Sequence, residues 1–524
     1  MLKIFQARDG NLTAEWKGVL LHSSYSPVKE VRKFLDSRLD PDTRTAIILG
    51  DSLGYITREA LLMNPGLKII EISYNPAFSR KLFTLNHLYW EPGQTLKLYQ
   101  FLSLHLDDLD LIHLSFLIWI PSAKIFPELS EEFSQTINTF LRERKGSLYT
   151  TGGFGKRWLK NSLKNYLCLS RVSLLSLSPG KPVFIAASGY SLNKDISLLK
   201  KYRSRYSLWA LPSSVQFLIH HGIVPDLIIQ TDPGFYTRYH LRIPEAHEVP
   251  LAMPLSSSVE HSQLDRPVFL FSQNHFFEPF LLNTLGQNFI TLPSTGTVAA
   301  AALQLGLLSH PSLLVVGGLD LISCDIHEHV NPNGFFSFLH FNSLRTSSAL
   351  TQAYNRTVLT GRRIDPGWQN QQLRTYSEWL NRFLGDSTSP LYRLNPSVIP
   401  LKGVQPVTGE HFSRLLSKME SIKKNKALDF CLMPQDEKRN NIEKILDFFI
   451  DSLKQAELTN QIVNQATNPR SLVYSLFTYL SLPQLISLIK VKDHLSAKIS
   501  SQRFSELSEK TISVLEELKQ DYLP

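Results

Sequence analysis

The chain has 524 residues, a formal net charge of +9, and 43% hydrophobic and 19% charged residues. This length exceeds what one hydrophobic core supports, so roughly two to four domains are expected, and the composition excludes a disordered chain. The basic residues are scattered rather than clustered with aromatic residues, so we expect no nucleic-acid partner.

The three cysteines are Cys168, Cys324 and Cys431. They form no Cys-x-x-Cys pair, which argues against a disulfide framework or a structural zinc site and is typical of a reducing compartment. The N-terminal stretch lacks the apolar segment of a signal peptide. We therefore expect a cytoplasmic protein.

Residues 1–165 are predicted to form a Rossmann-like α/β domain. Its clearest unit is a strand at Ala46–Leu49, a turn containing Gly50 and Gly54, a helix, and a second strand at Lys68–Ser73. Glu71, near the end of the second strand, is placed to bond a ribose hydroxyl of a nucleotide. The glycines are too few for the full fingerprint, so the alternative, a tight turn without a ligand, is favoured.

Residues 166–404 are predicted to form a central doubly wound α/β domain. Apolar runs that predict strands alternate with segments of helical spacing, which indicates a mostly parallel sheet with helices on both faces. The predicted strands are Val183–Ala187, Ser207–Ala210, Leu227–Gln230, Val268–Phe271 and Leu313–Val316, and the predicted helices are Ser191–Tyr202, Ser214–His221 and Thr297–Leu307. Ligands bind such sheets beyond the carboxyl ends of the strands.

The first strand end carries the turn Ser188-Gly189-Tyr190-Ser191. Gly189 permits a close backbone approach, and Ser191 can cap the helix that follows. Exposed N–H groups at a helix N-terminus favour an anion, so the turn is a candidate phosphate site. The alternative is an ordinary turn with a capped helix.

Asp232 follows another predicted strand and is placed to bind a ligand hydroxyl or a metal. An Asx turn closed by Pro233-Gly234 is an equally good interpretation. Farther along, Ser294, Thr295 and Gly296 open an Ala-rich helix and offer a second helix N-terminus with hydroxyl groups.

The strand Leu313–Val316 leads to two glycines and Asp320, which leave room beside a ligand. His327 and His329 follow in the next loop. A histidine beyond a strand end can act as a general base, because its pKa lies near physiological pH. A metal would need a third ligand, for which Asp320 or Asp325 is available; a surface loop without chemistry is the remaining alternative.

Residues 405–524 are predicted to form a helical domain, because apolar residues recur with helical spacing over 438–463 and 504–523. The uncharged stretch Ser471–Ile489 is about long enough to cross a bilayer. Pro483 divides it, so we predict two buried helices, with Ser481 near the start of the second, and no membrane span.

The order of these motifs resembles the motility-associated factor (Maf) family of flagellin glycosyltransferases. The resemblance is specific over Pro182–Asp232 and Pro293–His329, where the Gly-containing turn, His-Gly-Ile-Val-Pro-Asp, the Ser-Thr-Gly helix start and Gly-Gly-Leu-Asp-Leu follow one another. The central domain of that family is shared with pterin diphosphokinase-like proteins and is similar to bacterial sialyltransferases.

This resemblance implies transfer of a nonulosonic acid, of pseudaminic or legionaminic type, from a CMP-activated donor to Ser or Thr of flagellin. It implies no metal and no cofactor besides the CMP-sugar substrate. Catalytic roles would fall to His329, with His327 as second choice, and Asp320 would line the cleft. The donor nucleotide would be held by Ser188, Gly189, Ser191, Asp232, Ser294, Thr295 and Gly296.

Two alternatives stay open. Tyr190 stands where the sialyltransferase turn has Pro, and its bulk favours a catalytically decayed protein that binds flagellin without turnover. A pterin diphosphokinase-like enzyme would need a metal, for which Asp232 and Asp320 would be ligands. Flanking regions that resemble the Maf family argue against this second alternative.

Overall fold

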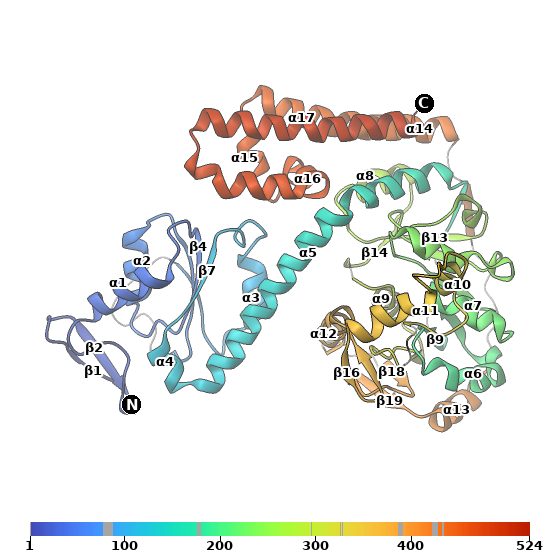
Figure 1. Cartoon of the computed structure of the whole chain (residues 1–524), viewed down its shortest axis with the longest axis horizontal. Coiled ribbons are helices and arrows are strands. Elements are labelled where there is room, and N and C mark those ends of the chain that lie inside the picture. Colours follow the sequence, from blue (N-terminus) through green and yellow to red (C-terminus); the bar gives the residue numbers. More distant parts are fainter. Residues whose placement is uncertain are drawn as a thin grey trace. The chain divides into compact units, whose positions relative to one another are not determined.

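The computed structural model divides the chain into two compact units (Figure 1). It describes residues 2–76, 87–174, 180–294, 296–324, 326, 328–385, 391–421, 428–431 and 434–523. The first unit comprises Met1–Gly155 and Phe449–Leu515, and the second comprises Lys156–Phe448 and Glu516–Pro524. The predicted division into three domains, 1–165, 166–404 and 405–524, stays a prediction.

The N-terminal part of the first unit is a Rossmann-like α/β layer structure. A parallel sheet with the strand order β6-β5-β4-β7 carries α1 and α2 against one face and α3 and α5 against the other. An antiparallel sheet, β1-β2-β3, precedes it. The elements are β1 (Leu2–Gln6), β2 (Leu12–Trp16), β3 (Val19–Leu20), α1 (Pro27–Arg38), β4 (Thr45–Leu49), α2 (Tyr55–Met63), β5 (Lys68–Ile72), β6 (Leu88–Trp90), α3 (Leu98–His105), β7 (Leu114–Ile118), α4 (Ile120–Ile125) and α5 (Pro127–Cys168).

Glu71, the candidate for a nucleotide contact, is bonded within the protein. Its carboxylate is buried and lies 2.6 Å from Nε2 of His87, and it also accepts a hydrogen bond from the Thr57 hydroxyl. The N-terminus of α2 is capped by Asp51, which accepts hydrogen bonds from the N–H groups of Gly54 and Thr57. The Glu71 carboxylate and two N–H groups at the start of α2 thus have partners within the protein, which favours a turn without a ligand.

The second unit is built on a large sheet with the order β19-β18-β15-β9-β10-β11-β12-β13-β8-β20, in which β14 also pairs with β13. All its pairs are parallel except β8 with β20. Its strands are β8 (Arg171–Leu174), β9 (Val183–Ala186), β10 (Ser207–Ala210), β11 (Leu227–Ile229), β12 (Leu251–Met253), β13 (Val268–Ser272), β14 (Ile290–Thr291), β15 (Leu314–Gly317), β18 (Leu391–Leu394), β19 (Val404–Val407) and β20 (Leu428–Cys431).

Helices cover both faces of this sheet, which confirms the doubly wound architecture (Figure 1). Side chains alternate in direction along β9, so Ile185 packs under α9 and α12 while Phe184 contacts Phe412 of α13 on the opposite face. The helices are α6 (Leu192–Lys201), α7 (Pro212–His220), α8 (Glu278–Leu282), α9 (Val298–Leu308), α10 (Gly334–Phe341), α11 (Ala349–Tyr354), α12 (Gln371–Gly385) and α13 (Gly409–Ser417), with the shorter η2 (Phe235–Leu241) and η6 (Asn355–Leu359) and the hairpin β16 (Arg362–Ile364) and β17 (Gly367–Gln369).

The C-terminal region is helical, as predicted, with α14 (Gln435–Leu458), α15 (Ile462–Ala466), α16 (Leu472–Val491) and α17 (Ala497–Tyr522). By length and composition α16 can cross a membrane, and 44% of its most apolar window is buried within the protein. Ser481 has non-helical φ and ψ angles two residues before Pro483, which confirms the predicted break. Gly155 of α5 packs so tightly on α16 that a Cβ atom there would lie 2.2 Å from the carbonyl oxygen of Tyr479.

Candidate functional site

The strand order of the second unit reverses between β9 and β15. From β9 the chain proceeds through β10, β11, β12 and β13, and then returns to place β15 on the other side of β9. In a doubly wound sheet such a reversal opens a crevice at the carboxyl ends of the two strands. The turn at 188–191 follows β9, and Gly318 and Asp320 follow β15, so both sequence motifs lie at this crevice.

Glycines allow the two turns to touch. The N–H group of Gly189 donates a hydrogen bond of 2.6 Å to the carbonyl oxygen of Gly318. A Cβ atom on Gly189 would lie 2.5 Å from that oxygen, and Gly318 itself has a φ of +69°. Residues with side chains fit neither position without displacing the backbone.

Asp320 caps the helix that follows the β9 turn. Its carboxylate accepts hydrogen bonds from the N–H group of Ser191 at 2.8 Å and from the Ser191 hydroxyl at 2.5 Å. A carboxylate at a helix N-terminus also interacts favourably with the helix dipole. The Asp320 carboxylate therefore occupies the position at the N-terminus of α6 where a phosphate was predicted.

Three further N–H groups, in this turn and at the start of α6, are bonded within the protein. Those of Gly189, Leu192 and Asn193 donate to carbonyl oxygens of the protein. The nucleotide roles of Ser188, Gly189 and Ser191 stay predictions. Asp320 is buried, so its geometry is that of a positioning residue.

A buried arginine of β18, which the sequence analysis missed, supports the β15 turn. The guanidinium group of Arg393 donates to the carbonyl oxygens of Leu319 and Asp320 and to the Ser397 hydroxyl. Burial lowers the pKa of Arg393 to about 10, so it stays charged at neutral pH.

A carboxyl group with a raised pKa lies in the first turn of α6. Asp195 of α6 is buried, and one of its oxygens accepts a hydrogen bond of 2.6 Å from the amide of Asn395. Burial raises the pKa of Asp195 to about 7, the Asn395 bond lowers it, and the charge of Asp320 raises it. Two buried carboxyl groups, those of Asp195 and Asp320, thus lie at the N-terminus of α6.

His329 is the candidate base whose geometry is defined. Its Nδ1 atom lies 2.9 Å from the hydroxyl oxygen of Ser188, which also accepts a hydrogen bond from the Ser213 hydroxyl at 2.8 Å. Burial lowers the pKa of His329; the charge of Glu328 raises it and that of Arg356 lowers it. The imidazole is therefore neutral at pH 7, the state that a general base requires.

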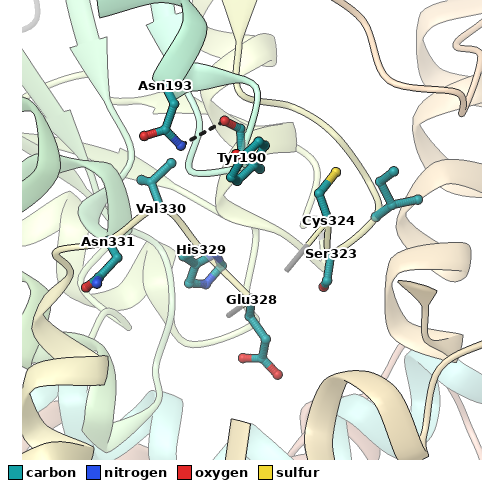
Figure 2. A pocket seen from close by; sticks show the side chains of 9 residues that line it. Tyr190, Asn193, Ser323, Cys324, Glu328, His329, Val330 and Asn331 are labelled. Atoms are coloured by element: carbon teal, nitrogen blue, oxygen red, sulfur yellow. Dashed lines mark hydrogen bonds between the residues drawn. The ribbon is translucent and has the colours of Figure 1, made fainter. Parts of the chain in front are cut away.

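A pocket of about 140 Å³ opens beside His329 (Figure 2). Tyr190 and Asn193 line it from the β9 turn, where the Asn193 amide donates to the Tyr190 carbonyl oxygen. Residues 322–324 and 328–331 line the rest. Tyr190 is half exposed and lines this pocket, so its large side chain is placed where it can restrict a ligand.

Tyr376 of α12 lies near two further candidates, Asp232 and Gly296, and was not recognised from the sequence. Its ring lies 3.7 Å from the position of a Cβ atom on Gly296. Burial raises the pKa of Tyr376, and the negative charges of Asp232 and Glu328 raise it further. Asp232, Gly296 and Glu328 are therefore near one side chain.

Asp232 forms an Asx turn, which was the alternative to a ligand-binding role. One of its carboxylate oxygens accepts a hydrogen bond of 2.7 Å from the N–H group of Gly234. Ser294 and Gly296 are exposed before α9, whose first turn is capped by Thr297. Thr295 and His327 lie outside the described residues. Among the residues that the structure describes, no group of three His, Cys, Asp or Glu side chains is arranged to hold a metal.

Known proteins resemble this chain in sequence and in fold. Residues 156–325 match the family model of 6-hydroxymethylpterin diphosphokinase MptE-like proteins. The chain superposes on the structure of a Maf glycosyltransferase from Magnetospirillum magneticum AMB-1 with a TM-score of 0.55 and 13% identity, covering 99% of this chain and 92% of the other. At this identity the superposition shows a shared fold.

Two uncharacterized proteins of Treponema pallidum (strain Nichols) are similar in sequence. One is 27% identical over 318 residues, which is 60% of this chain and 68% of the relative. The other is 23% identical over 128 residues, which is 24% of this chain and 61% of the relative, so the match spans less than two thirds of that protein.

Proposed function

The chain is Maf-like in fold with an MptE-like central region, and from this premise we propose that it is a glycosyltransferase. The reaction we propose moves a nonulosonic acid from a CMP-activated donor to a Ser or Thr hydroxyl of flagellin. The observation that supports it best is the contact between His329 and Ser188 beside the pocket at the β9 and β15 strand ends.

The chemistry needs a base for the acceptor hydroxyl. In the tautomer with its proton on Nδ1, His329 donates to the Ser188 oxygen and keeps the lone pair of Nε2 for the acceptor. The Ser213–Ser188 hydrogen bond fixes the hydroxyl that orients the ring. The acceptor oxygen forms a bond to the anomeric carbon of the sugar, the bond to the CMP phosphate oxygen breaks, and the acceptor proton passes to Nε2.

The departing CMP phosphate needs a positive environment. Because Asp320 fills the N-terminus of α6, we assign the phosphate to the N-terminus of α9, where Ser294 and Gly296 are exposed. Free N–H groups in a first helical turn bind phosphate oxygens. Asp232 and Tyr376 would then lie beside the donor near Gly296.

The first test is thermal stability of the purified chain with CMP, with ATP and Mg²⁺, and with neither. A ligand at 100 times its dissociation constant stabilises a protein by about 2.7 kcal/mol, which shifts its melting temperature measurably. A shift with CMP that is lost in Gly296→Trp supports the transferase and its donor site. Gly189 is unsuitable for this test, because any side chain there collides with Gly318 and Asp320 in the turn after β15.

A second candidate function is that of the matched family, a pterin diphosphokinase, which the match over residues 156–325 favours. Such an enzyme transfers a diphosphate from ATP and requires a divalent cation. A shift with ATP and Mg²⁺ that EDTA abolishes would favour it. No shift with either nucleotide, together with binding of purified flagellin, would favour a decayed flagellin-binding protein.

A further inference from the structure

Two segments of the second unit have an unusual composition. Residues 235–242 and 334–359 together contain four arginines, Arg238, Arg242, Arg345 and Arg356, and no Asp, Glu or Lys. They are rich in Phe, Tyr and Leu. The first segment forms η2, and the second forms α10, α11 and η6.

These segments pack into one surface, although about ninety residues separate them in sequence. The rings of Tyr239 and Phe338 stack with centroids 4.3 Å apart. The Tyr236 ring lies 5.5 Å from Phe338 and 5.8 Å from Phe335. We call residues 235–242 and 334–359 the aromatic–arginine surface.

Much of the apolar area of this surface faces solvent. Phe341 at the end of α10 is 91% exposed. Six further large apolar side chains of the surface are also exposed: Phe235, Tyr236, Leu344, Leu350, Tyr354 and Leu359. Exposed apolar groups that gather on one face mark interaction sites rather than ordinary surface.

Arginines lie over the aromatic rings of this surface. The guanidinium carbon of Arg238 is 3.6 Å from the ring centroid of Phe235, and that of Arg242 is 4.4 Å from Tyr239. Arg242 also pairs with Glu260. Among the described residues, no carboxylate forms an ion pair with Arg238 or Arg345, so these charges are available to a partner.

The surface is continuous with the pocket beside His329. Arg356 lies 3.8 Å from the Glu328 carboxylate, which lines the pocket, and stacks on Phe335. The His240 ring of η2 lies 6.2 Å from the His329 ring. A molecule held on the surface therefore has one edge at the pocket.

We propose that the aromatic–arginine surface is the docking site for the acceptor protein, and that it binds an acidic surface of that protein carrying exposed apolar side chains. The charges of Arg238 and Arg345 are complementary to carboxylates, which arginine binds in a bidentate manner. Aromatic residues and arginine are enriched in protein interfaces, where lysine is depleted, whereas anionic membranes attract lysine as well. The assignment of the acceptor rests on the proposed function.

The experiment measures binding of purified flagellin from the organism that encodes this chain to the immobilised full-length protein. The test variant combines Phe341→Ser with Arg345→Glu, two exposed positions whose change leaves the core intact. The matched control combines Leu104→Ser on α3, 68% exposed, with Arg470→Glu, both in the first unit. Melting temperatures within two degrees of the wild type establish that both variants are folded.

The expected result is a dissociation constant at least tenfold higher for the test variant and unchanged for the control. Equal binding of flagellin by all three proteins overturns the proposal. The proposal is also overturned if the wild-type chain does not bind flagellin but binds vesicles of anionic lipid, or associates with a second copy of itself through Phe341. Transfer is measured separately. If the test variant binds flagellin more weakly but the wild type transfers no sugar, the docking surface is supported and the proposed reaction is contradicted. If the test variant transfers sugar with an unchanged KM for flagellin, the docking surface alone is contradicted.

Discussion

Ser188 and His329 stand 141 residues apart in the sequence, yet their side chains meet at 2.9 Å. The contact exists because β9 and β15 are neighbours in the sheet, so that the loops after them converge. A second bond, from the N–H group of Val330 to the carbonyl oxygen of Ser188, ties the same two loops together. The pair is therefore held by the backbone as well as by its side chains.

If His329 is the base, the rate of sugar transfer depends on its neutral form. Burial lowers the pKa of His329 below the ordinary 6.5, so kcat/KM is expected to rise with pH through an inflection below 6.5 and to be flat from pH 7 to 8. His329→Ala is expected to lower kcat by about 10²- to 10⁴-fold. His411→Ala, an exposed histidine of α13, is the control.

Ser188→Ala is the matched test of the tautomer. It removes the hydroxyl that orients Nδ1 and leaves the ring, so the expected loss of kcat is smaller than for His329→Ala, and the inflection persists. An inflection above pH 6.5, or unchanged transfer by His329→Ala, contradicts the assignment of the base.

Asp320→Asn tests the cap of α6. The substitution removes a charge that accepts hydrogen bonds from the Ser191 N–H group and hydroxyl, and hydrogen bonds to charged groups contribute about 1.5–3 kcal/mol. We expect the second unit to melt at a lower temperature. Ser191→Ala keeps the N–H bond and should lose less stability. Equal stability of Asp320→Asn and the wild type would show that the cap is dispensable.

The strands nearest the site were predictable because they are buried on both faces. Their sequences are continuous apolar runs, as expected for central parallel strands: Val183–Ala186 and Leu314–Gly317. β12 (Leu251–Met253) was missed because Pro250 and Pro254 confine its apolar run to three residues. The long helix α5 was missed because glycines at 146, 152, 153 and 155 interrupt its helical spacing.

The site itself was predictable only as a set of motifs. Strand ends in a doubly wound sheet converge, so Ser188, Asp320 and His329 were placed correctly at one edge. What the sequence does not contain is strand order, and it is the adjacency of β9 and β15 that brings Asp320 onto Ser191. For the same reason Arg393 and Tyr376 carried no recognisable signal, since each reaches the site from an element that begins more than forty residues after His329.

Glu278→Gln is expected to change how stability depends on pH. The carboxyl group is fully buried at the end of β13, where it accepts hydrogen bonds from the Ser272 hydroxyl and the N–H group of Gln273. Burial raises its pKa to about 7, whereas these bonds lower it. The folded state thus binds more protons than the unfolded state between about pH 4.5 and 7, and this group makes stability fall as pH rises through that window.

Glutamine is neutral at every pH and keeps an oxygen for the same donors. The melting temperature of the variant minus that of the wild type should therefore be larger at pH 8 than at pH 5. Asp265→Asn, at a residue that follows η4 (His261–Leu264), is the control. A difference that is the same at both pH values would show that Glu278 is ionised throughout.

Gly189→Ala tests whether the two turns must touch. A methyl group there would lie 2.5 Å from the Gly318 carbonyl oxygen and 2.6 Å from a carboxylate oxygen of Asp320, so β9 and β15 must separate or the cap must open. Overpacking of this kind costs about 1–3 kcal/mol, and here it also disturbs the Ser188–His329 contact. We expect lower thermal stability together with lower transfer activity. Gly153→Ala in α5 is the control, because its Cβ atom would meet nothing within 4 Å and alanine favours a helix. If Gly189→Ala were as stable and active as Gly153→Ala, the close approach of the two turns would not be required.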